Sequence, residues 1–178
     1  MMNEINSHLI LSTKSMERNG LASSKGPVLV TGATGGVGSF SILLLSSLGY
    51  DVVAVSGKAA SEEQYLKSLG AKEVIERNLF EGDSRPLGKE TYSGCLDSCG
   101  GVVLANVLPV IKYDGVVSAC GLASGMNFNS TVAPFILRGV TLAGVESALV
   151  PLERRKLVYE RFGPMLTDEK LAIVSGKK

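Results

Sequence analysis

Short apolar runs alternate with longer amphipathic or polar stretches along most of this chain. From Pro27 onward, the short runs have the length and residue types of buried strands: Val28–Thr31, Asp51–Val55, Glu73–Ile75, Gly94–Asp97, Val116–Cys120 and Thr141–Val145. The longer stretches predict helices over Val37–Leu48, Ser61–Leu69, Gly101–Val110 and Leu152–Met165. Regular alternation of this kind predicts the α/β class: a doubly wound parallel sheet of about six strands with helices on both faces.

The polar and apolar pattern also divides the chain into two parts. Residues 1–25 are polar and poorly patterned, so we expect an N-terminal leader there, and no signal-peptide layout is visible. One domain is expected over residues 26–178. Ser61 with Gln64 predicts a capping box that opens the second helix, and Gly70 predicts the end of that helix.

A cluster of glycines joins the first predicted strand to the first predicted helix. Gly32, Gly35 and Gly38 stand three residues apart, whereas the better-known Gly-x-Gly-x-x-Gly spacing is absent. Glycines allow a sharp turn and a close approach of the backbone to a pyrophosphate, which the N–H groups at the helix start then bind. A plain tight turn is the alternative. The flanking strand and helix favour a dinucleotide site.

The segment after the second strand bears on which dinucleotide would bind. An acidic residue stands about 20 residues past the glycines in NAD-binding versions of such a unit and binds the ribose hydroxyls. Here that place reads Ser56-Gly57-Lys58, and the first carboxylate beyond it is Glu62. A hydroxyl, an open backbone and an ammonium group suit the 2′-phosphate of NADP. The alternative is that Lys58 is an ordinary solvated loop lysine.

Composition excludes several classes of function. The chain has 178 residues, 45% of them hydrophobic, which is enough for one α/β domain with a substantial core. Its 18 basic and 17 acidic residues leave a formal charge of +1, so there is no electrostatic case for nucleic-acid binding. The longest apolar runs fall far short of the roughly 18 residues of a membrane span.

The cysteines and the single histidine offer little chemistry. Cys95, Cys99 and Cys120 lie in strand-like apolar contexts and suggest a reduced, cytoplasmic core rather than a disulfide framework. His8 is remote from them, so a zinc site is not expected, and a serine hydrolase triad has only this histidine to use.

Two further nucleotide-dependent classes fail on their motifs. Lysine does not follow any of the five tyrosines at the fourth position, as a short-chain dehydrogenase would require. A P-loop requires Gly-Lys-Ser/Thr after the glycine turn, and the Gly-Lys pairs of this chain lack the hydroxyl residue and that context.

From about Met16 to about Leu166 the chain resembles the cofactor domain of medium-chain dehydrogenases/reductases, a Rossmann fold. Within them it is similar to the zinc-free quinone-oxidoreductase-like branch that includes NADPH-dependent acryloyl-CoA reductases. The motifs that carry the resemblance are Val30-Thr-Gly-Ala-Thr-Gly-Gly-Val-Gly38, Val55-Ser-Gly-Lys58, Tyr65-Leu-Lys-Ser-Leu-Gly-Ala71, Ala119-Cys-Gly-Leu-Ala123, Pro134-Phe-Ile-Leu-Arg-Gly-Val140 and Gly144-Val-Glu-Ser147.

The resemblance implies a set of cofactor-binding positions. It implies that the pyrophosphate is held by Thr34, Gly35, Gly36 and Val37, and Gly32 and Gly38 of the same glycine turn are counted among the cofactor-binding positions. It implies that Ser56, Gly57 and Lys58 take the 2′-phosphate and that Arg77 sits at the adenosine end. Leu122, Ile136 and Ser147 would line the nicotinamide side. The alternatives are a surface arginine for Arg77 and ordinary core packing for Leu122 and Ile136.

The same resemblance implies an activity and partners. We expect an NADP(H)-dependent oxidoreductase that transfers hydride to an activated carbon–carbon double bond of acryloyl-CoA, enone or quinone type, with no catalytic residue assigned in this chain. A nucleotide-binding module without catalytic activity is the alternative. The GroES-like domain of the family is not recognisable here, so we expect a fragment that is inactive alone. A homodimer through the edge strand Thr141–Val145 is also expected.

Overall fold

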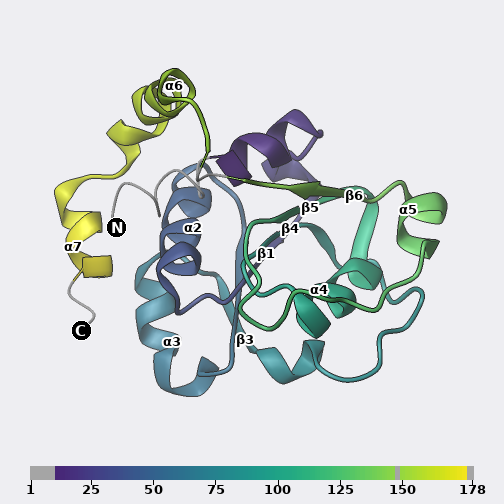
Figure 1. Ribbon diagram of the computed structural model, residues 1–178. Coiled ribbons are helices and arrows are strands. Elements are labelled where there is room, and N and C mark those ends of the chain that lie inside the picture. Colours follow the sequence, from purple (N-terminus) through teal and green to yellow (C-terminus); the bar gives the residue numbers. More distant parts are fainter. Residues whose placement is uncertain (1–10, 147–148, 176–178) are drawn as a thin grey trace.

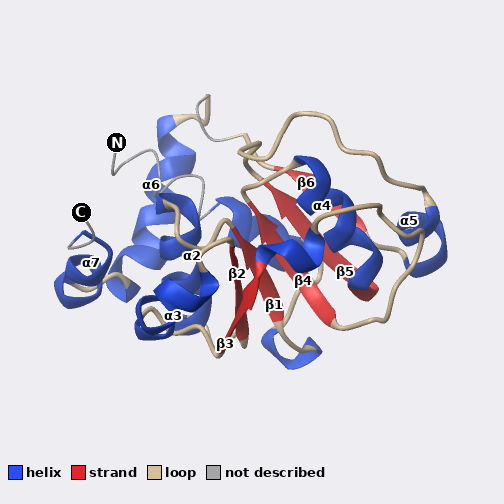
Figure 2. Ribbon diagram, turned by 90° about the horizontal axis from the view of Figure 1, so that it is seen from below, coloured by secondary structure: helices blue, strands red, loops and turns tan. Residues whose placement is uncertain are grey.

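A parallel sheet of six strands forms the centre of the molecule, drawn in red in Figure 2. The structure is a computed structural model that describes residues 11–146 and 149–175. The sheet order is β3-β2-β1-β4-β5-β6, and every neighbouring pair is parallel. Its strands are β1 (Val28–Thr31), β2 (Val52–Ser56), β3 (Glu73–Glu76), β4 (Tyr92–Asp97), β5 (Ile111–Ala119) and β6 (Thr141–Gly144). The predicted doubly wound sheet is therefore confirmed.

Helices cover both faces of this sheet (Figures 1 and 2). On one face lie α2 (Gly36–Ser47) and α3 (Ala59–Ser68), and on the other α4 (Gly101–Val107) with the short 3-10 turn η2 (Arg77–Phe80). The remaining helical elements are η1 (Ser23–Lys25), η3 (Leu108–Val110), α5 (Ala133–Arg138), α6 (Leu152–Phe162), η4 (Gly163–Met165) and α7 (Asp168–Ser175). Within the described ranges, no helix is long and apolar enough to cross a membrane.

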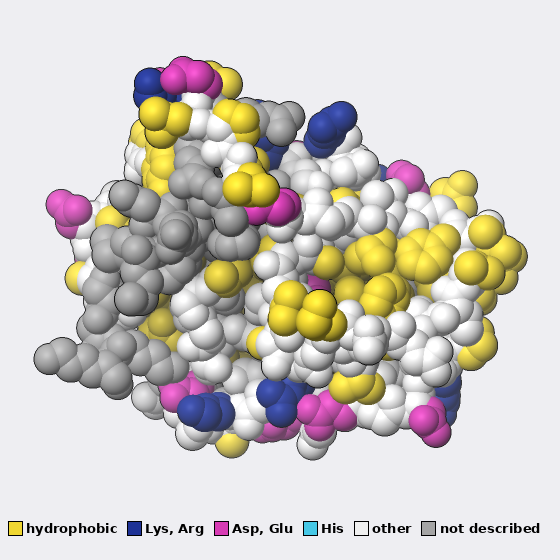
Figure 3. Space-filling view, viewed as in Figure 1, with side chains coloured by type: hydrophobic (Ala, Val, Ile, Leu, Met, Phe, Trp, Pro, Cys, Tyr) yellow, Lys and Arg dark blue, Asp and Glu magenta, His cyan; other side chains and the backbone are white. Residues whose placement is uncertain are grey.

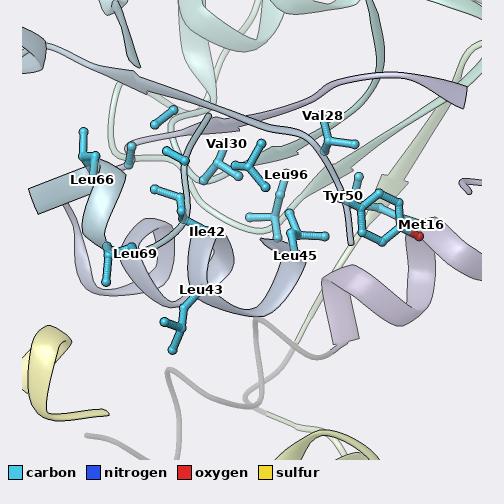
Figure 4. Close-up of a cluster of buried hydrophobic side chains, with 14 of the residues drawn as sticks. Met16, Val28, Val30, Ile42, Leu43, Leu45, Tyr50, Leu66, Leu69 and Leu96 are labelled. Atoms are coloured by element: carbon cyan, nitrogen blue, oxygen red, sulfur yellow. The ribbon is translucent and has the colours of Figure 1, made fainter. Parts of the chain in front are cut away.

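β1 and β2 are buried along their whole length, which explains their nearly continuous apolar runs. Side chains alternate along β1, so Val28 and Val30 pack with α2 and α3 while Leu29 packs with α4. Figure 4 shows the cluster of buried side chains on the α2 and α3 face, where Ile42 and Leu66 pack against the sheet. Each such fully buried side chain contributes about 1.5–3 kcal/mol through the hydrophobic effect.

Part of the segment predicted as a poorly patterned leader belongs to this core. Residues 11–18 form a helix, and Met16 is completely buried beside Val28 and Tyr50 in the cluster of Figure 4. Glu17 forms a 2.8 Å ion pair with Arg161. Buried apolar residues are few in this helix, so its hydrophobic pattern was too weak to identify it.

The remaining differences from the predictions concern the ends of elements. The capping box prediction is wrong: α3 begins at Ala59, and the Ser61 hydroxyl donates back to the carbonyl of Lys58 at 3.3 Å. Gly70 does end α3, with φ of +104°. The predicted third helix stops at Val107 and continues as η3, and α5 and α7 were not predicted because both are short.

Candidate cofactor site

All strands end at the same edge of the sheet, and the predicted residues follow several of those ends. The chain order along the sheet reverses between β1 and β4, which are direct neighbours. In open parallel sheets, ligands bind in the crevice that such a reversal leaves at the carboxyl ends of the strands. Thr31 ends β1 and Asp97 ends β4, so these two residues mark that point.

The glycine turn after β1 has two distinct kinds of glycine. Gly32 has φ of +62°, and the Gly35 N–H donates to its carbonyl at 2.9 Å, which closes the turn. Gly38 is buried, and a Cβ there would overlap the Gly32 carbonyl and lie 2.7 Å from the Ala33 Cα. Gly38 is therefore needed for the close packing of α2 on the turn.

Gly35 and Gly36, in contrast, are exposed at the start of α2. Gly35 is the N-cap residue, no side chain caps the helix, and its first turn holds no acidic residue. Thr34 and Val37 are half-buried beside them. The N–H groups at this helix start are thus open to an anion, with the positive end of the helix dipole behind them.

The segment after β2 meets the glycine turn. Ser56 is buried, and its hydroxyl lies 3.4 Å from the Thr34 hydroxyl, where either oxygen can donate. The Ser56 hydroxyl also accepts the backbone N–H of Lys58 at 3.0 Å. Gly57 and Lys58 are exposed just beyond. Residues predicted for the pyrophosphate and for the 2′-phosphate therefore lie in contact.

Arg77, at the start of η2, joins this group from β3. A Cβ added to Gly57 would lie 3.2 Å from the Arg77 Cζ, so the guanidinium lies against the bare backbone of Gly57. The Nε of Arg77 donates to Glu81 at 2.7 Å. Burial raises the pKa of the Cys99 thiol, and the positive charge of Arg77 acts against that rise. Arg77 is therefore close enough to the turn after β4 for its charge to act there.

Asp97 is a buried polar residue of this edge that the sequence reasoning missed as a site residue. Its carboxylate accepts the Thr31 hydroxyl at 2.6 Å and the Gly100 N–H at 2.8 Å. Ser98 completes the link, since its N–H donates to the Thr31 hydroxyl at 3.1 Å and its hydroxyl to the Thr31 carbonyl at 2.9 Å. Burial raises the pKa of Asp97, while these hydrogen bonds oppose the rise. The network locks the turn after β1 to the turn after β4.

The described residues among those predicted to line the nicotinamide side do not lie together at the glycine turn. Leu122 is 60% exposed and Ile136 is 73% exposed, so the alternative of core packing is wrong for both. Leu122 lies in the loop that packs against the turn after β4. A Cβ added to Gly100 in that turn would lie 3.1 Å from the Cα of Leu122. Ile136 lies in α5, which Figures 1 and 2 place far from α2, so the structure does not bring it to the glycine turn. Ser147 and His8 lie outside the described residues.

An exposed apolar surface surrounds α5. Figure 3 shows hydrophobic side chains gathered on the side of the molecule toward α5. At α5 itself, the exposed large apolar side chains are Val132, Ile136 and Leu137. Isolated exposed apolar residues are ordinary, whereas contiguous groups of them are typical of surfaces that contact a partner or a ligand.

The cysteines of the described ranges are free thiols. Burial raises the pKa of Cys95 and Cys99, and that of Cys120 to about 11. Burial therefore disfavours the thiolate form of these three cysteines. In the described part of the chain, no group of three or more His, Cys, Asp or Glu is arranged to hold a metal ion.

A separate hollow of about 290 Å³ opens where β6 ends, between the helix of residues 11–18 and Glu146. Lys14 and Arg18 line it, but none of the predicted cofactor residues does. This hollow is therefore not the predicted cofactor site.

Comparison with known proteins agrees with the fold class, a Rossmann-like α/β domain. The zinc-binding dehydrogenase family matches residues 36–158. The chain belongs to this family, within the medium-chain dehydrogenases/reductases.

Two curated relatives are acrylyl-CoA reductases. The chain is 49% identical over 152 residues to a protein named probable acrylyl-CoA reductase AcuI of Escherichia coli, covering 85% of this chain and 46% of that protein. It is 44% identical over 163 residues to acrylyl-CoA reductase AcuI of Ruegeria pomeroyi, covering 91% and 49%. The chain thus spans about half the length of the curated relatives it matches.

Two solved structures carry bound dinucleotides. The yhdH oxidoreductase of Salmonella enterica, in complex with NADP, has a TM-score of 0.91 and 44% identity over 96% of this chain and 52% of that one. The yhfP protein of Bacillus subtilis, with NAD bound, has a TM-score of 0.88 and 44% identity over 93% and 50%. Relatives of similar identity have therefore been solved with either dinucleotide.

Proposed function

We propose that this chain binds NADP(H) and serves as the cofactor domain of a reductase that transfers hydride to an activated carbon–carbon double bond. The observation that carries the proposal is the contact between the exposed start of α2 and the Ser56–Lys58 segment, with Arg77 beside them. Support comes from the acrylyl-CoA reductases among the relatives and from the NADP complex of the Salmonella protein.

Each phosphate group of the cofactor has residues that fit it. Gly35 and Gly36 leave room for a pyrophosphate at the N–H groups of α2, where a side chain on either would intrude. Ser56, Gly57 and Lys58 offer a hydroxyl, a backbone N–H and an ammonium group to a 2′-phosphate. Arg77 lies flat against Gly57, in a position to pair with that phosphate or to stack on the adenine.

The nicotinamide, when bound, supplies the hydride, and this chain's residues bind and orient it. In the part of the chain that the structure describes, we assign no general acid and no catalytic residue. The proposed substrate is an acryloyl thioester, an enone or a quinone, whose conjugated carbonyl accepts the negative charge that hydride addition creates. We further propose that the reaction needs no zinc, as the resemblance to the zinc-free branch of the family implies.

We propose that a GroES-like domain outside residues 1–178 completes the substrate pocket, and that the protein forms homodimers in the cytoplasm. Support for the dimer comes from β6, which pairs only with β5 among the described strands and so presents an edge. The apolar surface around α5 lies next to it and supports the same contact, or contact with the second domain.

The test is titration of the chain with NADPH by fluorescence, followed by steady-state NADPH oxidation with acryloyl-CoA and a simple quinone. Binding with negligible turnover is expected, because exclusion of water and positioning of the substrate, worth about 7–11 kcal/mol, depend on the covering domain. Turnover on the order of 10 per second by the chain alone would show that its own residues complete the pocket. Absence of NADPH binding would refute the proposed function. Binding that never leads to turnover, even with a GroES-like domain supplied, would favour a nucleotide-binding module.

A further inference from the structure

The Arg77–Glu81 ion pair is held in place more firmly than its exposed position suggests. η2 is a single turn anchored by Phe80, which is buried among the side chains under α4. The Glu81 N–H donates to the Asn78 carbonyl at 3.2 Å and ends that turn. The backbone of both partners is therefore fixed, four residues apart, next to the sheet edge.

The ion pair uses only one of the three guanidinium nitrogens of Arg77. The Nε of Arg77 donates to Oε1 of Glu81 at 2.7 Å. The terminal nitrogens Nη1 and Nη2 each lie 3.4 Å from the position that a Cβ of Gly57 would occupy, and neither donates to another described residue. An arginine presents its N–H groups in a rigid planar fork, so a bond at Nε sets the direction of the other four.

Glu81 has two effects of opposite sign on an anion at this place. Its negative charge repels a phosphate, while its hydrogen bond removes rotamer freedom that Arg77 would otherwise lose on binding. Both side chains are more than 40% exposed, so water and salt weaken the charge effect. The orienting effect does not depend on the dielectric in the same way.

Resting on the proposed function, we infer that Glu81 is a specificity-determining positioning residue. By holding Nε, it presents Nη1 and Nη2 of Arg77 to the 2′-phosphate beside Gly57. It therefore contributes to the preference for NADPH over NADH without touching the cofactor itself.

The experiment compares Glu81→Ala with Glu81→Gln. Alanine removes both the hydrogen bond and the charge, whereas glutamine keeps an acceptor oxygen and removes only the charge. Glu81→Ala should weaken NADPH binding by about two- to tenfold, as expected for one side chain that must be immobilised, and should leave NADH binding unchanged. Glu81→Gln should keep NADPH affinity at or above the wild-type value.

Two controls isolate the effect. Glu63→Ala breaks a matched ion pair, in which Glu63 lies 2.7 Å from the Lys67 ammonium group four residues further on, with similar exposure. This variant should change neither NADPH nor NADH affinity. In an Arg77→Ala background, Glu81→Ala should have no further effect, because the side chain it positions is gone.

Several outcomes would overturn the inference. Equal tightening of NADPH binding by both Glu81 variants would show that the carboxylate only repels the phosphate. A full effect of Glu81→Ala in the Arg77→Ala background, or equal weakening of NADPH and NADH, would place its action elsewhere. Failure of the proposed function gives a different pattern, in which wild type binds no NADPH or neither Lys58→Ala nor Arg77→Ala discriminates between the cofactors.

Discussion

Replacing Gly35 with valine should abolish cofactor binding without unfolding the domain. Gly35 has φ of −77° and ψ of 166°, which valine adopts readily, and an added Cβ would lie 3.2 Å from the Gly32 carbonyl oxygen. The loss of a favourable N-cap residue costs about 1 kcal/mol or less. For a chain of this length, that lowers the melting temperature by about 2–4 °C.

The effect on binding should be much larger. The branched side chain would stand over the N–H groups at the start of α2, where the pyrophosphate is expected. Hydrogen bonds to a charged group are worth about 1.5–3 kcal/mol each. Loss of two of them costs at least about 3 kcal/mol, or roughly 100-fold in affinity for both NADPH and NADH.

Gly38→Ala is the matched comparison, since it changes a buried glycine of the same turn that packs against the backbone, whereas Gly35 is exposed. Its methyl group would overlap the Gly32 carbonyl, and such overpacking costs about 1–3 kcal/mol. Better helix propensity offsets about 1 kcal/mol of this. Because the added methyl group would meet backbone atoms that cannot move aside without shifting the turn, the upper end of that range applies. Gly38→Ala should then lower stability by more than Gly35→Val does, as measured by thermal melting alongside fluorescence titration. Unimpaired NADPH binding by a Gly35→Val protein with a near-wild-type melting curve would refute the assignment of the turn to phosphate.

Three further predictions concern Lys58, Asp97 and Leu142. Lys58→Ala should weaken NADPH binding by about 1.5–3 kcal/mol and leave NADH binding unchanged in the same titration; equal losses would contradict a 2′-phosphate contact. Burial raises the pKa of Asp97 above its ordinary 3.8, so the folded state binds this proton more tightly than the unfolded chain. The contribution of Asp97 to stability is therefore full below pH 3.8 and is lost as pH rises through the folded-state pKa. In urea unfolding from pH 3.5 to 7, the stability of wild type relative to Asp97→Asn should fall with rising pH, and a constant difference would contradict this. Leu142→Lys, on edge strand β6, should shift a dimer toward monomer in light scattering, whereas a wild-type monomer at high concentration would count against the interface.

The strands could be predicted because the central ones, which are buried on both faces, leave a simple signal in the sequence. Runs such as Val28–Thr31 and Val52–Ser56 are buried throughout and apolar except for their last residue, and glycines separate them from the following helices. The ends of elements could not be predicted as well, because hydrogen bonds decide them locally. Ser61 illustrates this, since its hydroxyl bonds the Lys58 carbonyl instead of capping a helix.

The candidate site could be predicted where its residues follow directly on strands. Thr34 and Ser56 come from consecutive strand ends, so sequence order alone brings them to one edge. Asp97 was missed because its partner Thr31 is 66 residues away and because it stands at the end of an otherwise apolar strand. Glu81 was missed because its role depends on the direction of the Arg77 side chain, which no spacing in the sequence reveals.

The most direct test of the account is a titration of the wild-type chain with NADPH and with NADH under identical salt conditions. A charge-assisted contact to the 2′-phosphate predicts that NADPH binds at least about tenfold more tightly, with a preference that declines as salt is raised. Equal affinities, or tighter binding of NADH, would contradict the assignment of Ser56, Gly57, Lys58 and Arg77 to that phosphate.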